Sequence, residues 1–442
     1  MSQYCDGFTR TPRTVEAIRS FINTQDLDGV RADDDFTVVF RLLTPALDFL
    51  NIVTLPYASP VPAEYLDYLP DSPEFRQRTL SNGPYQITRY VQNREMILER
   101  NPVWDAATDP LRPAYVHRIR LRLGADAQLQ HLQIEAGTAD LSFDEPVPRA
   151  ELSSLLATDD PTVWLMPPGK TYVAYSYIMF NHVGPNGALK QRPVRLAIAL
   201  AVDKAAVVQL AGGPLVARAL RQAVPSSFTG YRNGADQNVT PGDRGDPAAA
   251  QRLLAEAGYP RGRTFSLAYG TYGSMPLTAQ VLQANLGRAG VDIRLMPLTG
   301  ADLYGRLLSN PESARRGEWD LALESLTGPD WFGENNGRSM AMTQFDSRQL
   351  TQNASNFGGY SDRHLNALFD RATSAQSVEL AKQAWSDAAR LLMDDIALVP
   401  LVESKRAFAR SRRVRNCTSN GSNCDPTVLW LADAGNAQGT FR

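Results

Sequence analysis

The sequence predicts a protein of the α/β class, because patterns typical of strands alternate with patterns typical of helices along its 442 residues. The clearest example is a strand pattern at 265–269, a helix pattern at 277–289 that ends before Gly290, and an alternating strand pattern at 291–295. This order predicts a βαβ unit with two parallel strands. The length also exceeds the size at which one hydrophobic core continues to grow, so we expect two or more lobes.

Capping and turn residues predict two further elements. Residues 246–257 form a helix pattern in which Asp246 is the expected N-cap and Gly258 follows the last turn. Near the start of the chain, residues 30–42 have the pattern of a β-hairpin, with the acidic triplet at 33–35 as its turn. We interpret this triplet as a solvated turn rather than as a metal site.

Two amphipathic patterns predict longer helices at 192–210 and 361–372, the second with Ser361 as its cap. Their apolar stripes consist of Val194, Ala197, Ile198 and Ala201 in the first helix and Leu365, Leu368, Phe369 and Ala372 in the second. We expect both stripes to face the hydrophobic core rather than a cofactor.

Composition argues against several classes of function. Lysine and arginine total 45 against 47 acidic residues, a net charge of -2, and the charges are interspersed, which gives no basic surface for nucleic acid. No apolar run reaches the roughly 18 to 20 residues that cross a bilayer. Residues 1–20 lack the features of a signal peptide, which taken alone predicts a cytoplasmic chain.

The cysteines indicate a different compartment. Cys417 and Cys424 bracket a polar turn rich in asparagine and glycine, so we predict a disulfide between them, which implies an oxidising environment. The alternative is two unrelated surface cysteines. No histidine or third thiol lies nearby in the sequence, which disfavours a metal site. Cys5 is left over, and its partner is not defined.

Motifs of catalysis are missing from the sequence. None of the histidines, His117, His131, His182 and His364, stands in a setting typical of a catalytic triad or a zinc protease. Glycine-rich nucleotide loops are absent as well. We therefore expect no enzyme, no cofactor and no metal.

A series of short motifs runs in order along nearly the whole chain. These motifs are SNGPYQI at 81–87 with ILERNPVW at 97–104, LQIEAGTAD at 132–140, FN at 180–181, RPVRLAIALAVDK at 192–204, GYP at 258–260 and NFGGYSD at 356–362. Together they resemble the oligopeptide, dipeptide and nickel family of ABC-importer solute-binding proteins, the bacterial extracellular solute-binding proteins of family 5. Most of these residues are expected to be scaffold rather than solute ligands.

The resemblance implies a type II periplasmic-binding-protein-like fold, with two lobes that close on a solute and an extra small domain. By analogy, residues 1–80 are a remnant of the small domain, 81–180 with 404–442 form one lobe, and 181–403 form the other. It also implies that the N-terminal part of the fold is missing, as in a fragment, a misassigned start or a decayed gene.

The resemblance further suggests a binding segment. Asp330 matches the aspartate that meets the ammonium group of bound peptides, Trp331 offers a flat wall for a side chain, and Thr327 lies just before them. The alternative is a turn aspartate beside a core tryptophan. Tyr175 and Tyr177 are further candidates for the cleft, although their alternation fits a half-buried strand equally well.

We therefore expect an extracytoplasmic receptor, in the cell envelope or periplasm and from a family that includes lipoproteins, that delivers oligopeptides to the permease subunits of an ABC importer. We expect it to be a monomer with no nucleic-acid partner. The residues after Asp330 depart from the family pattern, so other solutes, such as a sugar, a haem or a metal chelate, stay open. A non-transport sensor and a non-functional fragment are the remaining alternatives.

Overall fold

The computed structural model describes residues 7–8, 10–25, 29–55, 58–70, 72–143, 146–158, 160, 162–166, 174–327, 336–350, 354–418 and 424–432. The chain divides into two compact units. Unit 1 comprises Met1–Pro45, Val53–Phe143 and Ser411–Arg442, and unit 2 comprises Ala46–Ile52 and Asp144–Arg410. The division at residues 80, 180 and 403 that the sequence suggests stays a prediction.

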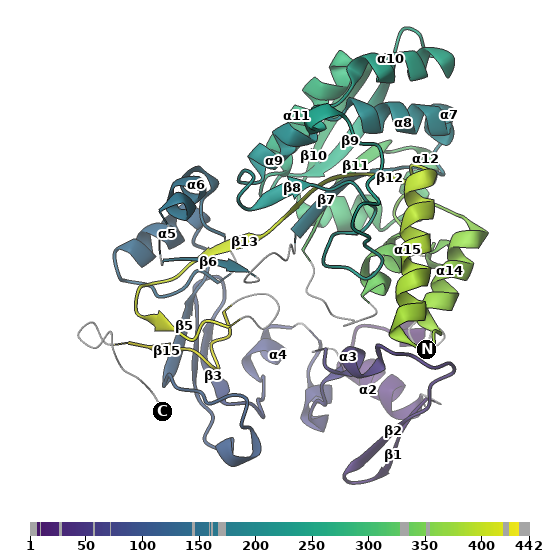
Figure 1. The fold of residues 1–442 in the computed structure, drawn as a ribbon. Coiled ribbons are helices and arrows are strands. Elements are labelled where there is room, and N and C mark those ends of the chain that lie inside the picture. Colours follow the sequence, from purple (N-terminus) through teal and green to yellow (C-terminus); the bar gives the residue numbers. More distant parts are fainter. Residues whose placement is uncertain are drawn as a thin grey trace. The chain divides into compact units, whose positions relative to one another are not determined.

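A six-stranded sheet forms the centre of unit 2 (Figure 1). Its strands, in spatial order, are β10 (Val291–Leu298), β9 (Arg263–Gly270), β11 (Leu321–Thr327), β7 (Ala174–Phe180), β12 (Leu398–Ser404) and β8 (Ala217–Ala219). Strands β10, β9 and β11 are parallel, whereas β7 is antiparallel to both of its neighbours. The parallel pair β9 and β10, joined through helix α11 (Met275–Arg288), confirms the predicted βαβ unit.

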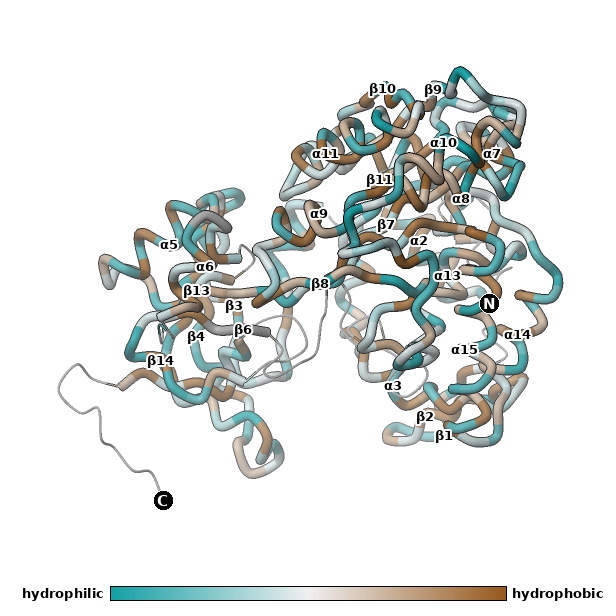
Figure 2. The backbone as a smooth tube through the Cα atoms, turned by 45° about the horizontal axis from the view of Figure 1, so that its top comes forward, coloured by the Kyte–Doolittle hydropathy of each residue, from teal (hydrophilic) through white to brown (hydrophobic). Residues whose placement is uncertain are grey.

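Helices cover both faces of this sheet (Figure 1). One face carries α8 (Arg192–Ala201), α9 (Lys204–Leu210), α10 (Pro247–Glu256) and α11, and the other carries η5 (Ala301–Leu308), α14 (Arg363–Thr373) and α15 (Val378–Asp394). Residues of β7 alternate between two hydrophobic cores: Tyr177 and Met179 pack in one, Ile178 and Phe180 in the other. Figure 2 shows the hydrophobic segments of β7 and β11 within the unit. This layered order is that of the predicted α/β class.

Smaller elements complete unit 2. Strands β6 (Val163–Met166) and β13 (Arg406–Ala409) form a separate antiparallel pair. The remaining short helices of this unit include α6 (Arg149–Ala157), α7 (Gly187–Lys190), α12 (Pro311–Arg316) and α13 (Thr343–Phe345). Helix α3 (Phe49–Val53) spans a boundary between the two units.

Unit 1 is organised around the three-stranded antiparallel sheet β3 (Tyr85–Val91), β4 (Glu95–Arg100) and β5 (Arg118–Arg122). The antiparallel pair β1 (Val30–Asp34) and β2 (Thr37–Phe40) confirms the predicted hairpin, but its turn lies at residues 35–36, so only Asp35 of the acidic triplet belongs to the turn. Further elements are α2 (Val15–Thr24), α4 (Pro73–Gln77), α5 (Ala127–Glu135), β14 (Val414–Arg415) and β15 (Trp430–Leu431). A disulfide joins Cys417 to Cys424, as predicted, whereas Cys5 lies outside the described residues.

Two helix predictions need correction. The pattern at 192–210 forms two helices rather than one, because Val202 is extended and the carboxylate of Asp203 caps α9. At the start of α14, the cap is Asp362 and not Ser361. In both places, an aspartate that accepts a backbone N–H group sets the first turn of the helix.

The motif residues of unit 1 tie distant backbone segments together. The Asn101 Nδ2 group donates to the carbonyl oxygens of Ser81 at 2.7 Å and Gly83 at 3.0 Å, which holds the turn before β3 against the end of β4. The Asp140 carboxylate accepts from Arg413 Nε at 2.7 Å and Nη2 at 2.9 Å. These contacts support the expectation that the motif residues are scaffold.

The motif residues of unit 2 do the same around the sheet. The buried Asn181 Nδ2 group, directly after β7, donates to the carbonyl oxygens of Ala314 and Trp319, both at 2.8 Å. The Asp320 carboxylate, directly before β11, accepts from Ser266 N at 2.8 Å and Ser266 Oγ at 2.9 Å. Side chains at the strand ends thus hold β7, β9 and β11 in register.

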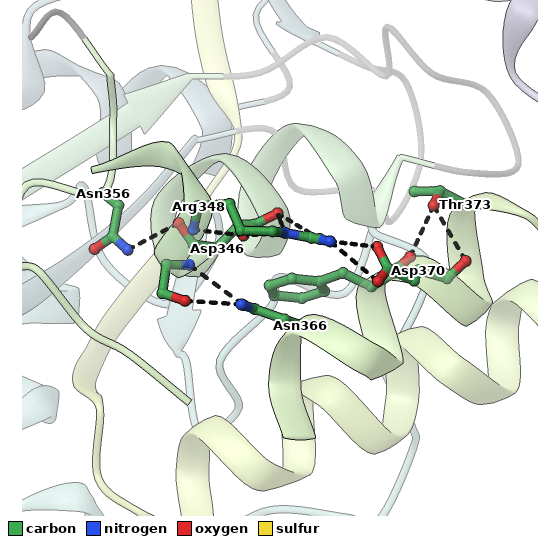
Figure 3. A network of polar contacts seen from close by, with 8 residues as sticks. Asp346, Arg348, Asn356, Asn366, Asp370 and Thr373 are labelled. Atoms are coloured by element: carbon green, nitrogen blue, oxygen red, sulfur yellow. Dashed lines mark hydrogen bonds and ion pairs between the residues drawn. The ribbon is translucent and has the colours of Figure 1, made fainter. Parts of the chain in front are cut away.

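A polar network holds the segment before α14 against that helix (Figure 3). Arg348 binds both carboxylate oxygens of Asp346, with Nε 2.9 Å from Oδ1 and Nη2 2.8 Å from Oδ2, and its Nη1 donates to Asp370 Oδ2 at 3.0 Å. Asn356 Nδ2 donates to the Asp346 carbonyl oxygen at 3.1 Å. Asn366, on α14, accepts a hydrogen bond from the Ser347 backbone N–H group and donates one to the Ser347 hydroxyl. The bidentate geometry makes this cluster a rigid anchor.

Arg195 fastens α8 to the connection between α15 and β12. Its side chain is buried, and its guanidinium donates to the carbonyl oxygens of Ile396 at 3.0 Å, Leu189 at 2.9 Å and Asp395 at 2.6 Å, and to the Asp395 carboxylate at 2.9 Å. One side chain therefore satisfies acceptors from two separate segments of the fold.

We predict that Arg195→Met lowers the free energy of unfolding by about 3 kcal/mol, because buried acceptors lose their donor. Urea unfolding at pH 7 measures this loss. Arg252→Met, at an exposed position on α10, is the matched control and is expected to change stability by less than about 0.5 kcal/mol. Equal effects of the two substitutions would contradict the structural role of Arg195.

Candidate functional site

The carboxyl ends of the parallel strands β9, β10 and β11 meet along one edge of the sheet in unit 2. Ligands of α/β proteins bind at such edges. The antiparallel strand β7 begins at this edge, and its register places Ala174 opposite Thr327 and Tyr175 opposite Leu326. The register therefore brings the predicted site residues Thr327, Tyr175 and Tyr177 together at and just inside the edge.

Both tyrosines lie in the hydrophobic core of one sheet face. Tyr175 is 4% exposed and Tyr177 is fully buried. Their rings stack with centroids 6.4 Å apart, and the Tyr175 and Phe228 rings form a T-shaped pair with centroids 5.6 Å apart. Contact of either tyrosine with a solute stays a prediction. Asp330 and Trp331, the principal candidates, lie outside the described residues.

Glu324 is a feature of this edge that the motif analysis missed. It stands opposite Tyr177 in the register and is fully buried. Neither its carboxylate oxygens nor the Tyr177 hydroxyl has a hydrogen-bond partner in the part of the chain that the structure describes. The available sequence signal was a single charged residue, Glu324, within the strand pattern of β11.

Burial sets the ionisation of this carboxyl group. It raises the pKa of Glu324 to about 8, and the opposing effect of the nearby Tyr304 hydroxyl is smaller. The group is therefore mostly protonated at neutral pH. Burial likewise raises the pKa of Tyr177 and of Tyr304, so the cluster is uncharged and holds several hydroxyl groups.

A line of hydroxyl groups runs from this cluster to the surface. Tyr304, on η5 after β10, lies with its hydroxyl 3.4 Å from that of Tyr272, which follows β9 and is 43% exposed. The loops that follow two parallel strands thus place aromatic hydroxyls at the carboxyl edge. Such an arrangement offers flat apolar walls and hydrogen bonds for binding.

The described residues form neither a metal site nor a membrane-spanning helix. In them, no group of three or more histidine, cysteine or acidic side chains is placed to hold a metal ion. No helix among these residues combines the length and the apolar character that crossing a bilayer requires.

The chain is similar to known solute-binding proteins over most of its length. The family model for bacterial extracellular solute-binding proteins, family 5 Middle, matches residues 7–347. Di/tripeptide-binding protein 4 of Pseudomonas aeruginosa is 26% identical, with 89% of this chain and 70% of that protein covered. The probable ABC transporter periplasmic-binding protein SapA of Escherichia coli is 27% identical, with 87% and 66% covered.

A solved structure extends this similarity to the fold. The structure of clavulanic acid biosynthesis oligopeptide binding protein 2 is 27% identical, has a TM-score of 0.79, and is matched over 92% of this chain and 73% of that one. The chain thus spans between about two thirds and three quarters of the length of these relatives.

We predict that Glu324→Gln flattens the pH dependence of stability. The folded pKa of about 8 exceeds the ordinary value of 4.5, so the folded protein holds a proton that the unfolded chain releases. This stabilisation is complete below pH 4.5 and is lost as the pH rises through about 8, a change on the order of several kcal/mol.

Urea unfolding between pH 5 and pH 8.5 tests this prediction. The free energy of unfolding of the parent should fall more steeply with rising pH than that of Glu324→Gln. Glu256→Gln, at an exposed position on α10, is the control and should follow the parent. Identical slopes for the parent and Glu324→Gln would mean that the buried carboxyl group is already ionised.

Proposed function

Because the chain belongs to the bacterial extracellular solute-binding proteins of family 5, we propose that it is an extracytoplasmic receptor that captures oligopeptides for an ABC importer. The match over residues 7–347, which includes parts of both units, is the observation that carries this proposal. Relatives named for binding di/tripeptides and oligopeptides support a peptide as the solute. Delivery to permease subunits, a location in the cell envelope or periplasm, and action as a monomer without catalysis belong to the same proposal.

The proposed recognition step is capture of the peptide's ammonium group by Asp330. This residue follows closely after Thr327, the last residue of β11, and Trp331 is adjacent to it in the sequence. A charge-assisted contact between ammonium and carboxylate is worth about 1.5 to 3 kcal/mol, which corresponds to roughly 10- to 150-fold in affinity. Trp331 would supply a flat surface for the first side chain of the peptide.

Tyr175 and Tyr177 support this proposal through the paired ends of β7 and β11. Both side chains are packed in the core, so they keep the ends of β7 and β11 rigid at the edge from which the Asp330 segment departs in the sequence. A rigid base lowers the entropy cost of binding. Thr327, at the last paired position of β11, is the proposed transition from scaffold to binding loop.

We predict that di- to octapeptides raise the Tm of the parent, because a ligand that prefers the folded state stabilises it by mass action. Asp330→Asn should bind the same peptides at least tenfold more weakly, and N-acetylated peptides should lose affinity for the parent to a similar extent. Differential scanning fluorimetry and calorimetric titration measure these effects. Asp292→Asn, on the exposed side of β10, is the control.

Three results would count against parts of this proposal. A cooperative melt that no peptide shifts would exclude oligopeptides and direct the search to sugars and chelates. Peptide binding that is equal in the parent and Asp330→Asn would exclude Asp330 from the ammonium site. Absence of a cooperative melt would indicate that this chain does not act as a receptor by itself.

A further inference from the structure

A pocket opens at the carboxyl edge of the sheet, wholly within unit 2 and on the face that carries α9 and α11. It holds about 500 Å³ of space, part of which is open to solvent, so it suits one group of a solute rather than a whole peptide. None of the described residues that line it is charged. We call it the hydroxyl pocket after the serine and threonine residues in its lining: Ser176, Ser274, Thr278, Ser325 and Ser404.

The inner wall of the hydroxyl pocket is apolar. Val207, Met275, Leu323 and Val402 line it, and each of these side chains is at most 6% exposed. All four also belong to the hydrophobic core on this face of the sheet. The core therefore reaches the surface at the pocket, and an apolar group that enters there would extend it.

The strand register explains why space is left at this edge. Ser176 of β7 pairs with Ser325 of β11, and the next pair inward on the same face is Ile178 with Leu323. On the other side of β7, strand β12 ends at Ser404. Large apolar side chains thus give way to serines at the edge of three adjacent strands, and the short serine side chains leave the pocket open.

This lining favours an uncharged aliphatic group. Burial of a branched side chain of four carbons against the apolar wall is worth roughly 10- to 150-fold in affinity. A charged group would lose its hydration without an opposite charge in the described lining.

The start of α11 offers no compensation to an anion. Pro276 has no N–H group, the Met275 N–H group donates to the Tyr272 carbonyl oxygen at 3.3 Å, and that of Thr278 donates to Ser274 at 2.9 Å. The backbone donors that would attract a negative oxygen are therefore absent or already bonded.

We propose that the hydroxyl pocket binds one uncharged aliphatic side chain of the solute and selects against charged side chains. The apolar wall takes the end of the side chain, while the exposed Ser325 and the half-buried Ser176 and Ser404 stay in contact with water at the mouth. That the side chain belongs to a peptide rests on the proposed function. The preference for an uncharged aliphatic group rests only on the pocket.

Titration calorimetry of the parent tests the proposal with trialanine and with tripeptides in which leucine, aspartate or lysine replaces one alanine at the first, second or third position. We expect leucine at one position to raise the affinity about tenfold over trialanine. Aspartate or lysine at that same position should bind no more tightly than alanine. This comparison needs no variant, so it does not depend on the folding of a mutant.

A variant with a charge at the mouth of the pocket sharpens the test. Ser325→Asp, at an exposed position of β11, should lower the preference for leucine over lysine at that position by about fivefold, because the new carboxylate attracts the ammonium group. Thr264→Asp, at an exposed position near the amino end of the neighbouring strand β9, is the matched control and should keep the preference of the parent. Equal preferences in the parent and Ser325→Asp would count against the pocket.

A second arm does not require the solute to be a peptide. In protein labelled at the methionine methyl groups, the NMR signal of Met275, assigned by its loss in Met275→Leu, reports on the wall of the pocket. We expect N-acetylleucine amide to shift this signal and N-acetyllysine amide to leave it unchanged.

The two arms separate the two proposals. If trialanine binds and leucine improves binding at no position, the pocket proposal is overturned while the peptide proposal stands. If no peptide binds the parent, the peptide proposal fails, and the methyl signal alone decides whether the pocket takes an aliphatic group. A Met275 signal that N-acetylleucine amide does not shift would then overturn the pocket proposal as well.

Discussion

The pairing of β7 with β11 and β12 is the constraint on which the rest of unit 2 depends. Because side chains alternate along a strand, a slip of one residue would exchange Tyr177 with Ile178 and reverse both cores. Asn181 prevents such a slip, since its side chain, directly after β7, is bonded to the backbone at Trp319, directly before Asp320 and β11. The positions of Glu324 and Ser325 follow from this one register.

The same alternation gives the edge of the sheet two chemical faces. On one face, a neutral carboxyl group lies among tyrosines, where burial makes ionisation unfavourable. On the other, small hydroxyl residues lie beside the N-terminus of α11. Glu324 and Ser325, two consecutive residues of β11, thus face two different environments. Each environment is built from residues that are far apart in the sequence.

The sequence predicted those features that depend on neighbouring residues. The βαβ unit, the cap at Asp246 and the bridge between Cys417 and Cys424 are all local patterns, and each is confirmed. The break at Asp203 was missed because the apolar stripe continues on both sides of it. Glu324 was missed because only the pairing with distant strands reveals which residues of β11 face a core. The hydroxyl pocket was beyond prediction for the same reason, since five separate elements supply it.

The motif asparagines bind main-chain atoms, so their contacts do not depend on the side chains of the residues that they join. Asn101 and Asn181 contact carbonyl oxygens, which every residue possesses, so the identity of their neighbours is free to vary without loss of the contact. These two motif asparagines therefore stabilise the backbone of the fold independently of the side chains around them. Side chains at the carboxyl edge of the sheet can therefore be exchanged without loss of the contacts that hold its strands in register.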